Sequence, residues 1–210
     1  MKKMINKFID EGLSFDKKTI GIICLVFFIS GIFGWVYEFI FYYFNGGMKI
    51  FYMQGGNYLP WINIYGVGSL LIILCAYKYR KKPWLVFLIA LISTGLLEYF
   101  SGLVILKFFG RRLWDYNVEI LNFGNIGGFV CLRSVLFFGI SGLLLMYVIV
   151  PFIKFLSEKI PTKIFLIISI SLCCLVLIDE FYNLLFARIW SLPRAADFYK
   201  SLGFKYVEFK

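Results

Sequence analysis

The stretch TIGIICLVFFISGIFGWVYEFIFYYF (residues 19–44) decides the fold, because it is almost entirely apolar and contains a single charged residue, Glu38. An apolar run of roughly 18 or more residues is long enough to cross a bilayer as a helix. Comparable blocks follow along the chain, at 62–77, 84–106, 126–153 and 164–187. The sequence therefore predicts an all-α integral membrane protein, built as a bundle of about five transmembrane helices.

Composition supports the same class. The 210 residues are 61% hydrophobic and 21% aromatic, whereas soluble domains are about 45–50% apolar. The formal net charge is +10, but basic residues at the ends of membrane helices explain such a charge without nucleic acid as a partner. The expected partner is the lipid bilayer.

The residue types also limit the chemistry. The chain has no histidine, and its five cysteines, which lie in apolar blocks without C-x-x-C spacing, are interpreted as buried small apolar residues. No recognisable nucleophile or metal-ligand set accompanies them. We therefore expect no catalytic residue, no metal and no cofactor.

The loops predict an orientation in the membrane. Residues 1–18 are polar and mixed in charge, and they are interpreted as a cytoplasmic segment rather than a cleavable signal. The loop 78–82 carries four basic residues and the loop 45–61 carries one, which places the N-terminus and loop 78–82 on the cytoplasmic side of a cell membrane. The transmembrane domain is then 19–187, followed by a tail, 188–210, in which aromatic and basic residues mix as in interfacial segments.

The odd-numbered spans resemble one another. Each contains a glutamate followed by aromatic residues, in YEFIFYYF, LEYFSG and DEFYNLLF. This pattern predicts a bundle built from repeated helical hairpins; chance likeness between apolar helices is the alternative.

A few charges interrupt the spans, namely Glu38, Glu98, Arg133, Asp179 and Glu180. A charge near the centre of a bilayer costs roughly 2.5–3.5 kcal/mol on insertion scales, so it usually faces the bundle interior and has a partner. We expect Arg133 to pair with Glu98 or Glu38. The small residues beside each glutamate would let another helix approach closely.

The loop FGRRLWDYN (residues 109–117) concentrates polar side chains in an apolar chain. With the N-terminus inside, Glu38, Glu98, Glu180 and Arg133 fall in the outer half of the membrane, beneath the loop 107–125. We expect a polar pocket there, closed by a lid whose carboxylate, Asp115, pairs with Arg111, Arg112 or Arg133. The lid residues are Arg112, Trp114, Asp115 and Tyr116. The alternative is an interfacial anchor, since Trp, Tyr and Arg are common at membrane surfaces.

Several motifs occur in a characteristic order: SGIFGWVYE (30–38), LPWINIYGVGSL (59–70), LLEYFSG (96–102), GRRLWDYN (110–117) and NIGGFVCLRSVLFFG (125–139). In this order they resemble the putative ABC-transporter type IV family, also called CmpB-like, a family of multi-spanning bacterial membrane proteins. The chain departs from the family pattern at Asn63, Leu113, Phe129 and Val130. The basic residue before Cys131 is thereby lost, and Arg133 would take its place.

The resemblance implies a permease-like membrane component of a transporter with an unknown small-molecule substrate. The sequence contains no G-x-x-x-x-G-K-[ST] loop to cradle nucleotide phosphates, so a separate ATPase subunit would drive transport. The candidate substrate-binding residues are Glu38, Glu98, Arg112, Trp114, Asp115, Tyr116, Arg133 and Glu180.

Two other functions stay open. One is a small-molecule sensor or assembly subunit without turnover. Assembly of the chain into a homo-oligomer also stays open, whichever function it has. The less favoured one is an intramembrane enzyme acting on a lipid-linked substrate, in which Glu38, Glu98 and Asp115 would serve as acid and base.

Overall fold

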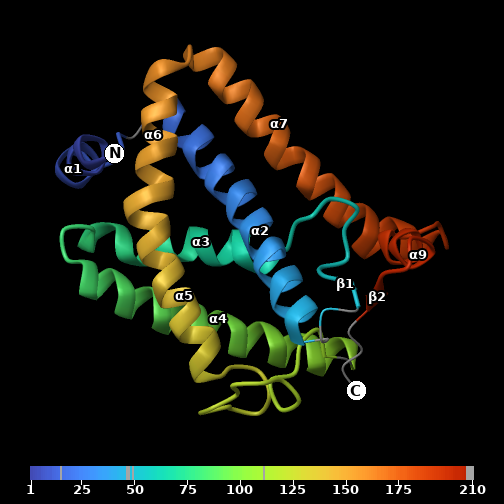
Figure 1. The fold of residues 1–210 in the computed structure, drawn as a ribbon. Helices are drawn as coiled ribbons and strands as arrows, with labels where there is room; N and C mark the ends of the chain where they lie inside the picture. Colours follow the sequence, from blue (N-terminus) through green and yellow to red (C-terminus); the bar gives the residue numbers. More distant parts are fainter. Residues whose placement is uncertain (15, 46–47, 49, 111, 207–210) are drawn as a thin grey trace. The chain divides into compact units, whose positions relative to one another are not determined.

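The fold is helical, as the sequence predicts. The computed structural model describes residues 1–14, 16–45, 48, 50–110 and 112–206. The α-helices are α1 (Lys2–Glu11), α2 (Lys17–Asn45), α3 (Asn63–Ala76), α4 (Pro83–Phe109), α5 (Leu132–Leu144), α6 (Val150–Lys159), α7 (Thr162–Phe181), α8 (Ala187–Ile189) and α9 (Ala195–Ser201). A 3₁₀ turn covers Tyr77–Tyr79, π-helical segments cover Leu145–Ile149 and Tyr182–Phe186, and the short strands β1 (Tyr52–Met53) and β2 (Lys205–Tyr206) pair in parallel (Figure 1).

Among the described residues, four helical stretches are long and apolar enough to cross a membrane: Lys17–Asn45, Pro83–Phe108, Leu132–Lys159 and Thr162–Ile189. The expected second span is different. Helix α3 has 14 residues, which rise about 21 Å, whereas the hydrocarbon core is about 30 Å thick. The described part of the chain therefore has four long apolar helices and one shorter one in place of five similar spans.

The fourth span also begins later than expected. Residues 126–130 fold as a tight turn in which Ile126 and Val130 form an antiparallel bridge. Gly128 within this turn has a φ of +81°, a conformation that suits glycine. The helix starts at Leu132 instead, where Cys131 and Ser134 satisfy its first backbone groups, and it continues to Lys159 through the π-helical segment. Pro151 lies just after that segment, and a proline inside a helix removes one backbone donor.

The long helices expose large apolar side chains. Leu74 is 81% exposed, Ile178 is 69% exposed and Ile140 is 62% exposed. Soluble proteins rarely present such continuous apolar faces to water, but lipid is the matching solvent for a helix whose backbone groups are all bonded internally. Cys75 and Cys174 are exposed, Cys24 and Cys173 are half-buried, and Cys131 is buried, so the expectation of buried cysteines holds fully for Cys131 alone.

The chain forms two compact units. Among the described residues, unit 1 contains Met1–Ser14 and Gly68–Leu156, and unit 2 contains 16–67 and 157–206. In unit 1, α4 packs against α5, as Figure 1 shows. Gly142 of α5 lies so close to α4 that an added Cβ would come within 2.4 Å of the Ala90 Cβ. Small residues therefore let these two helices meet closely, as expected for membrane helices.

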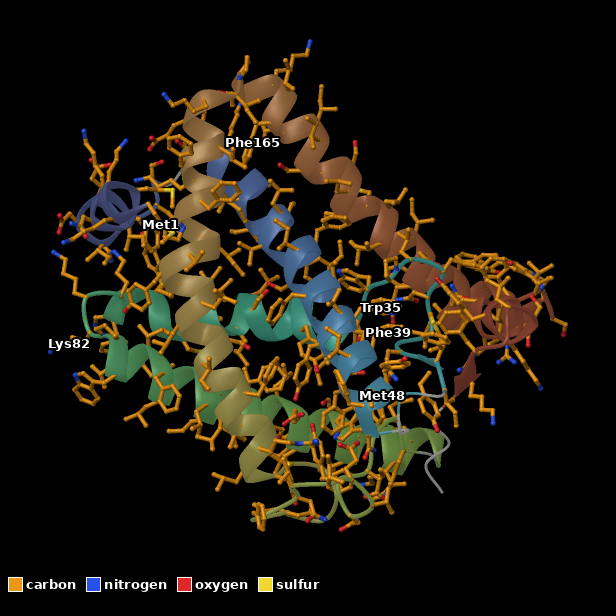
Figure 2. The ribbon with its side chains drawn as sticks, viewed as in Figure 1. Met1, Trp35, Phe39, Met48, Lys82 and Phe165 are labelled. Carbon is orange, nitrogen blue, oxygen red and sulfur yellow. The ribbon has the colours of Figure 1, made fainter. Side chains whose placement is uncertain are left out.

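Helix α1 belongs to unit 1 and contacts the turn between α3 and α4, at whose tip Lys82 lies (Figure 2). The buried ring of Phe8 packs on Tyr77 at 6.1 Å. The Arg80 Nε donates to the Ile9 carbonyl at 3.1 Å, and Lys154 of α6 forms an ion pair with Glu11 at 3.2 Å. The N-terminal segment, the turn and the start of α6 therefore lie at the same end of unit 1.

In unit 2, α2 packs against α7. Phe165 of α7, labelled in Figure 2, fills the space beside Gly21, where an added Cβ would come within 2.6 Å of the ring. Further along α2, Trp35 and Phe39 stack on successive turns with ring centroids 5.1 Å apart. Close packing at a small residue thus joins the helices of this unit as well.

The C-terminal tail of unit 2 adds secondary structure that the sequence did not suggest. Strand β2 pairs with β1, with Tyr52 opposite Lys205. The tail is held further by Tyr58, whose hydroxyl donates to the Pro193 carbonyl at 3.1 Å, and by Tyr199, whose hydroxyl donates to the Tyr58 carbonyl at 2.7 Å. An interfacial location for this tail stays a prediction.

Candidate functional site

The candidate site in unit 1 is built around Glu98 of α4. Its side chain is buried, with 4% of the residue exposed. Small residues on the same helix let neighbouring segments come close: an added Cβ at Gly95 would lie 2.9 Å from Val135, and one at Gly102 would lie 2.7 Å from Phe129 and 3.1 Å from Trp114. Helix α5 and the loop 110–131 therefore pack directly over the part of α4 that carries the glutamate.

Tyr116 reaches Glu98 from the loop. Its hydroxyl donates a hydrogen bond to Glu98 Oε1 at 2.6 Å. Burial, the neighbouring Glu98 charge and this hydrogen bond raise the pKa of Tyr116 well above its ordinary value, so the hydroxyl keeps its proton. The second oxygen, Glu98 Oε2, is buried and has no hydrogen-bond partner among the described residues.

Arg133 at the start of α5 forms its salt bridge with Glu119 of the loop. Both side chains are largely buried, at 15% and 5% exposure, and the guanidinium also lies 5.3 Å from the centre of the Tyr116 ring. The sequence predicted a buried ion pair for Arg133 but named Glu98 or Glu38 as its partner. The loop folds back before α5 begins, so the carboxylate of its own connecting segment comes within reach.

Asp115 pairs with Arg112, as expected for the lid. The Arg112 Nε lies 3.6 Å from Asp115 Oδ2, and Arg112 Nη1 donates to the Gly127 carbonyl at 2.9 Å. Asp115 Oδ1 also accepts from the Asn117 backbone N–H and side-chain amide, at 3.0 and 2.6 Å. Arg111, the other arginine considered, lies outside the described residues. The two carboxylate oxygens of Asp115 are thus bound by Arg112, which precedes it in the chain, and by Asn117, which follows it.

The two arms of the loop are joined across their length. Trp114 Nε1 donates to the Phe129 carbonyl at 2.9 Å, and the Tyr116 N–H donates to the Gly128 carbonyl at 3.0 Å. An added Cβ at Gly128 would come within 2.5 Å of Asp115, Asn117 and Arg112 atoms, so only glycine fits there. Trp114 therefore contacts the protein rather than acting only as an exposed anchor.

Unit 2 contains a second polar cluster, at the end of α7. Asp179 accepts from the backbone N–H of Tyr58 at 3.1 Å and from that of Leu59 at 2.7 Å. Glu180 accepts from the Asn57 amide at 2.6 Å through Oε2 and from the Asn63 amide at 2.9 Å through Oε1. These hydrogen bonds clamp the segment 57–63 to α7. Every donor in these four bonds is uncharged.

Glu38 occupies a third position. It accepts a hydrogen bond from the Tyr65 hydroxyl at 3.0 Å, and the Tyr65 ring covers Gly34 one turn earlier on α2. Glu38, like Glu180, belongs to unit 2.

Six of the eight predicted site residues come together in unit 1: Glu98, Arg112, Trp114, Asp115, Tyr116 and Arg133. Glu38 and Glu180 contribute to unit 2, and their part in a shared pocket stays a prediction. Glu119 was missed, although it is an acidic residue in the same polar loop. In the part of the chain that the structure describes, no group of three or more Asp, Glu, Cys or His residues could hold a metal ion.

The helices and the polar loop define a multi-spanning helical membrane protein with charged residues held inside unit 1. The model of the family described as "Putative ABC-transporter type IV" matches residues 25–184. The chain belongs to this family. Neither the curated proteins nor the solved structures include a significant match to it.

Proposed function

We propose that this chain is the permease-like membrane subunit of a transporter and that its substrate binds at the polar cluster of unit 1. Membership of the family makes it a transporter-related membrane component at a coarse level. The single observation that supports the site is the buried Oε2 of Glu98, which has no partner among the described residues while Tyr116 holds Oε1. A buried polar atom without a partner is costly, and a ligand that binds this oxygen would remove that cost.

The loop 110–131 acts as the lid of this site. Arg112 and Asp115 fix its shape, and Tyr116 ties it to Glu98. Movement of the lid would uncover the glutamate for a ligand and cover it again, as alternating access requires. A separate ATPase subunit supplies the energy, since the sequence lacks a phosphate-binding loop.

We place the lid on the outer side of the membrane. Helix α1, the turn 77–82 and Lys154 share one end of unit 1, and basic residues concentrate on cytoplasmic sides. A cysteine replacing Lys81 tests this orientation, because it should resist an impermeant thiol reagent in intact cells. Rapid labelling there would reverse the orientation. The chain's own cysteines are first replaced so that only the introduced thiol reacts.

The transport proposal is tested in cells that lack the chain. Metabolites inside and outside these cells are compared with those of cells carrying the wild type, Asp115→Asn, or the control Asp197→Asn. Asp197 forms an exposed pair with Arg194 in the tail, so it matches the substitution without touching the site.

A compound whose distribution follows the wild type and the control, but not Asp115→Asn, supports a transport site at the lid. If every compound is distributed alike in the strain that lacks the chain and in the three strains that contain equal amounts of inserted protein, the transport proposal is contradicted. If a compound binds the purified protein and its distribution never changes, the chain is a sensor.

A further inference from the structure

The charges inside unit 1 do not balance. Arg133 is paired with Glu119, and Arg112 is paired with Asp115. Glu98 is the additional acid, and it is buried among these groups. The titratable and polar groups that face it are Tyr116 and Glu119 from the loop, and Arg133 and Ser134 from α5. An ionised Glu98 would therefore add a negative charge to a cluster whose described arginines already have acidic partners.

The two oxygens of Glu98 are in different environments. Oε1 accepts from the Tyr116 hydroxyl at 2.6 Å, whereas Oε2 is buried without a hydrogen-bond partner among the described residues. A buried carboxylate normally gathers several donors or a cation, because an uncompensated buried charge is far more costly than a neutral polar group. The nearby Ser134 hydroxyl donates instead to the Cys131 carbonyl at 2.9 Å, so Tyr116 is the donor that the geometry gives to Glu98. One donor on one oxygen fits a neutral carboxyl group better than an ionised one.

We propose that Glu98 is a proton-binding site, which carries one proton on Oε2 while the loop 110–131 is closed over it. Binding is a simple protonation: the carboxylate takes one proton from a hydronium ion, which becomes water, and Glu98 becomes a neutral acid with Tyr116 still donating to Oε1. A proton needs no cavity and only one ligand atom. A metal ion would need several oxygen ligands, and the described residues offer no cluster of three acidic or sulfur ligands.

The Tyr116 hydroxyl fits this assignment. Its burial, the largest cause, raises its pKa, so it keeps its own proton and donates to Glu98. Opening of the loop would remove Tyr116 and admit water, and hydration favours the ionised carboxylate. Proton release is thereby linked to lid opening. This link deepens the proposed transport function and rests on it, whereas the proton site itself does not.

Infrared difference spectroscopy of the purified protein in lipid nanodiscs tests the site without a substrate or an ATPase. A protonated, buried carboxyl group gives a C=O stretching band that a carboxylate lacks. We expect this band in the wild type at neutral pH, its loss in Glu98→Gln, and its retention in Glu180→Gln. Glu180 is the matched control, because both of its oxygens accept amide hydrogen bonds in the other unit.

Tyr116→Phe is the second variant, and it tests whether the band belongs to Glu98 even if Glu98→Gln does not fold. Loss of the donated hydrogen bond should move the band to higher frequency. A wild type without the band, a band that survives Glu98→Gln, or a frequency that ignores Tyr116→Phe would each overturn the proposal. A band that behaves as expected in a protein that transports nothing would keep the proton site and reject the transport function.

Discussion

The loop 110–131 of unit 1 and the segment 57–63 of unit 2 are both bonded to charged side chains of long helices, but with different chemistry. In unit 2, Asp179 and Glu180 receive backbone N–H groups and side-chain amides on all four oxygens. In unit 1, the bonds are two ion pairs and a tyrosine, and one glutamate oxygen has no partner among the described residues. In unit 2 every carboxylate oxygen of the clamp is bonded, so its role is structural stabilisation. In unit 1 the Oε2 of Glu98, unbonded among the described residues, is the feature on which the proposed function rests.

The largest expected effect comes from breaking the buried pair of unit 1. Arg133→Ala leaves Glu119 buried without its cation, which should cost about 3–5 kcal/mol of unfolding free energy. The melting temperature in detergent measures it. Glu119→Gln in the same chain should restore part of the loss, because it removes the isolated charge. Additive losses would show that the two residues do not interact, and Arg194→Ala, at an exposed pair, is the control.

The next largest loss of stability is expected in unit 2, where Asp179 binds the segment 57–63. Asp179→Ala removes the acceptor of two backbone N–H groups and should cost about 1.5–3 kcal/mol, the range for hydrogen bonds to charged groups. Limited proteolysis should then cut near residues 57–59 sooner than in the wild type. Asp179→Asn keeps one carbonyl oxygen, so its cleavage rate should lie between those of the wild type and Asp179→Ala. Equal protection in all three proteins would mean that Asp179 does not clamp the segment.

Close packing in unit 2 predicts a smaller effect. An added Cβ at Gly31 would come within 1.9 Å of the indole of Trp61, which is 1% exposed. Gly31→Ala should therefore cost about 1–3 kcal/mol, as overpacked sites do, and lower the melting temperature. Gly56→Ala is the matched control, since nothing lies within 4 Å of its added Cβ. If both substitutions behave alike, α2 does not depend on this contact.

The smallest effect tests the charge state of Glu98 through stability. Tyr116→Phe keeps the ring and removes the hydroxyl that bonds Oε1. Against a neutral carboxyl group the loss should be about 0.5–1.5 kcal/mol, whereas a bond to a charged group is worth about 1.5–3 kcal/mol. Chemical unfolding in mixed micelles measures the difference. A loss in the higher range would indicate an ionised Glu98 and make the two units more alike.

The helices could be predicted from the sequence because apolar blocks and charge placement are local signals. Glu98 and the loop residues Arg112 to Tyr116 stood out for the same reason. The partner of Arg133 could not be predicted, because it depends on how the loop folds back around Gly128. The late start of α5 was missed since residues 126–131 are as apolar as a span, and only their turn geometry separates them from the helix.

The division of the chain has a consequence for synthesis. Unit 2 is made of two pieces separated by residues 68–156, so Asn57 and Asn63 leave the ribosome long before Glu180, the residue that binds them. Ribosomes add roughly 5–20 residues per second, and the first piece therefore waits several seconds in the membrane. Most of unit 1 is continuous in sequence and can assemble during that interval. Newly made chains that stop before α7 would contain a complete α4–α5 pair and an α2 that lacks its packing partner, and we expect membrane quality control to degrade them.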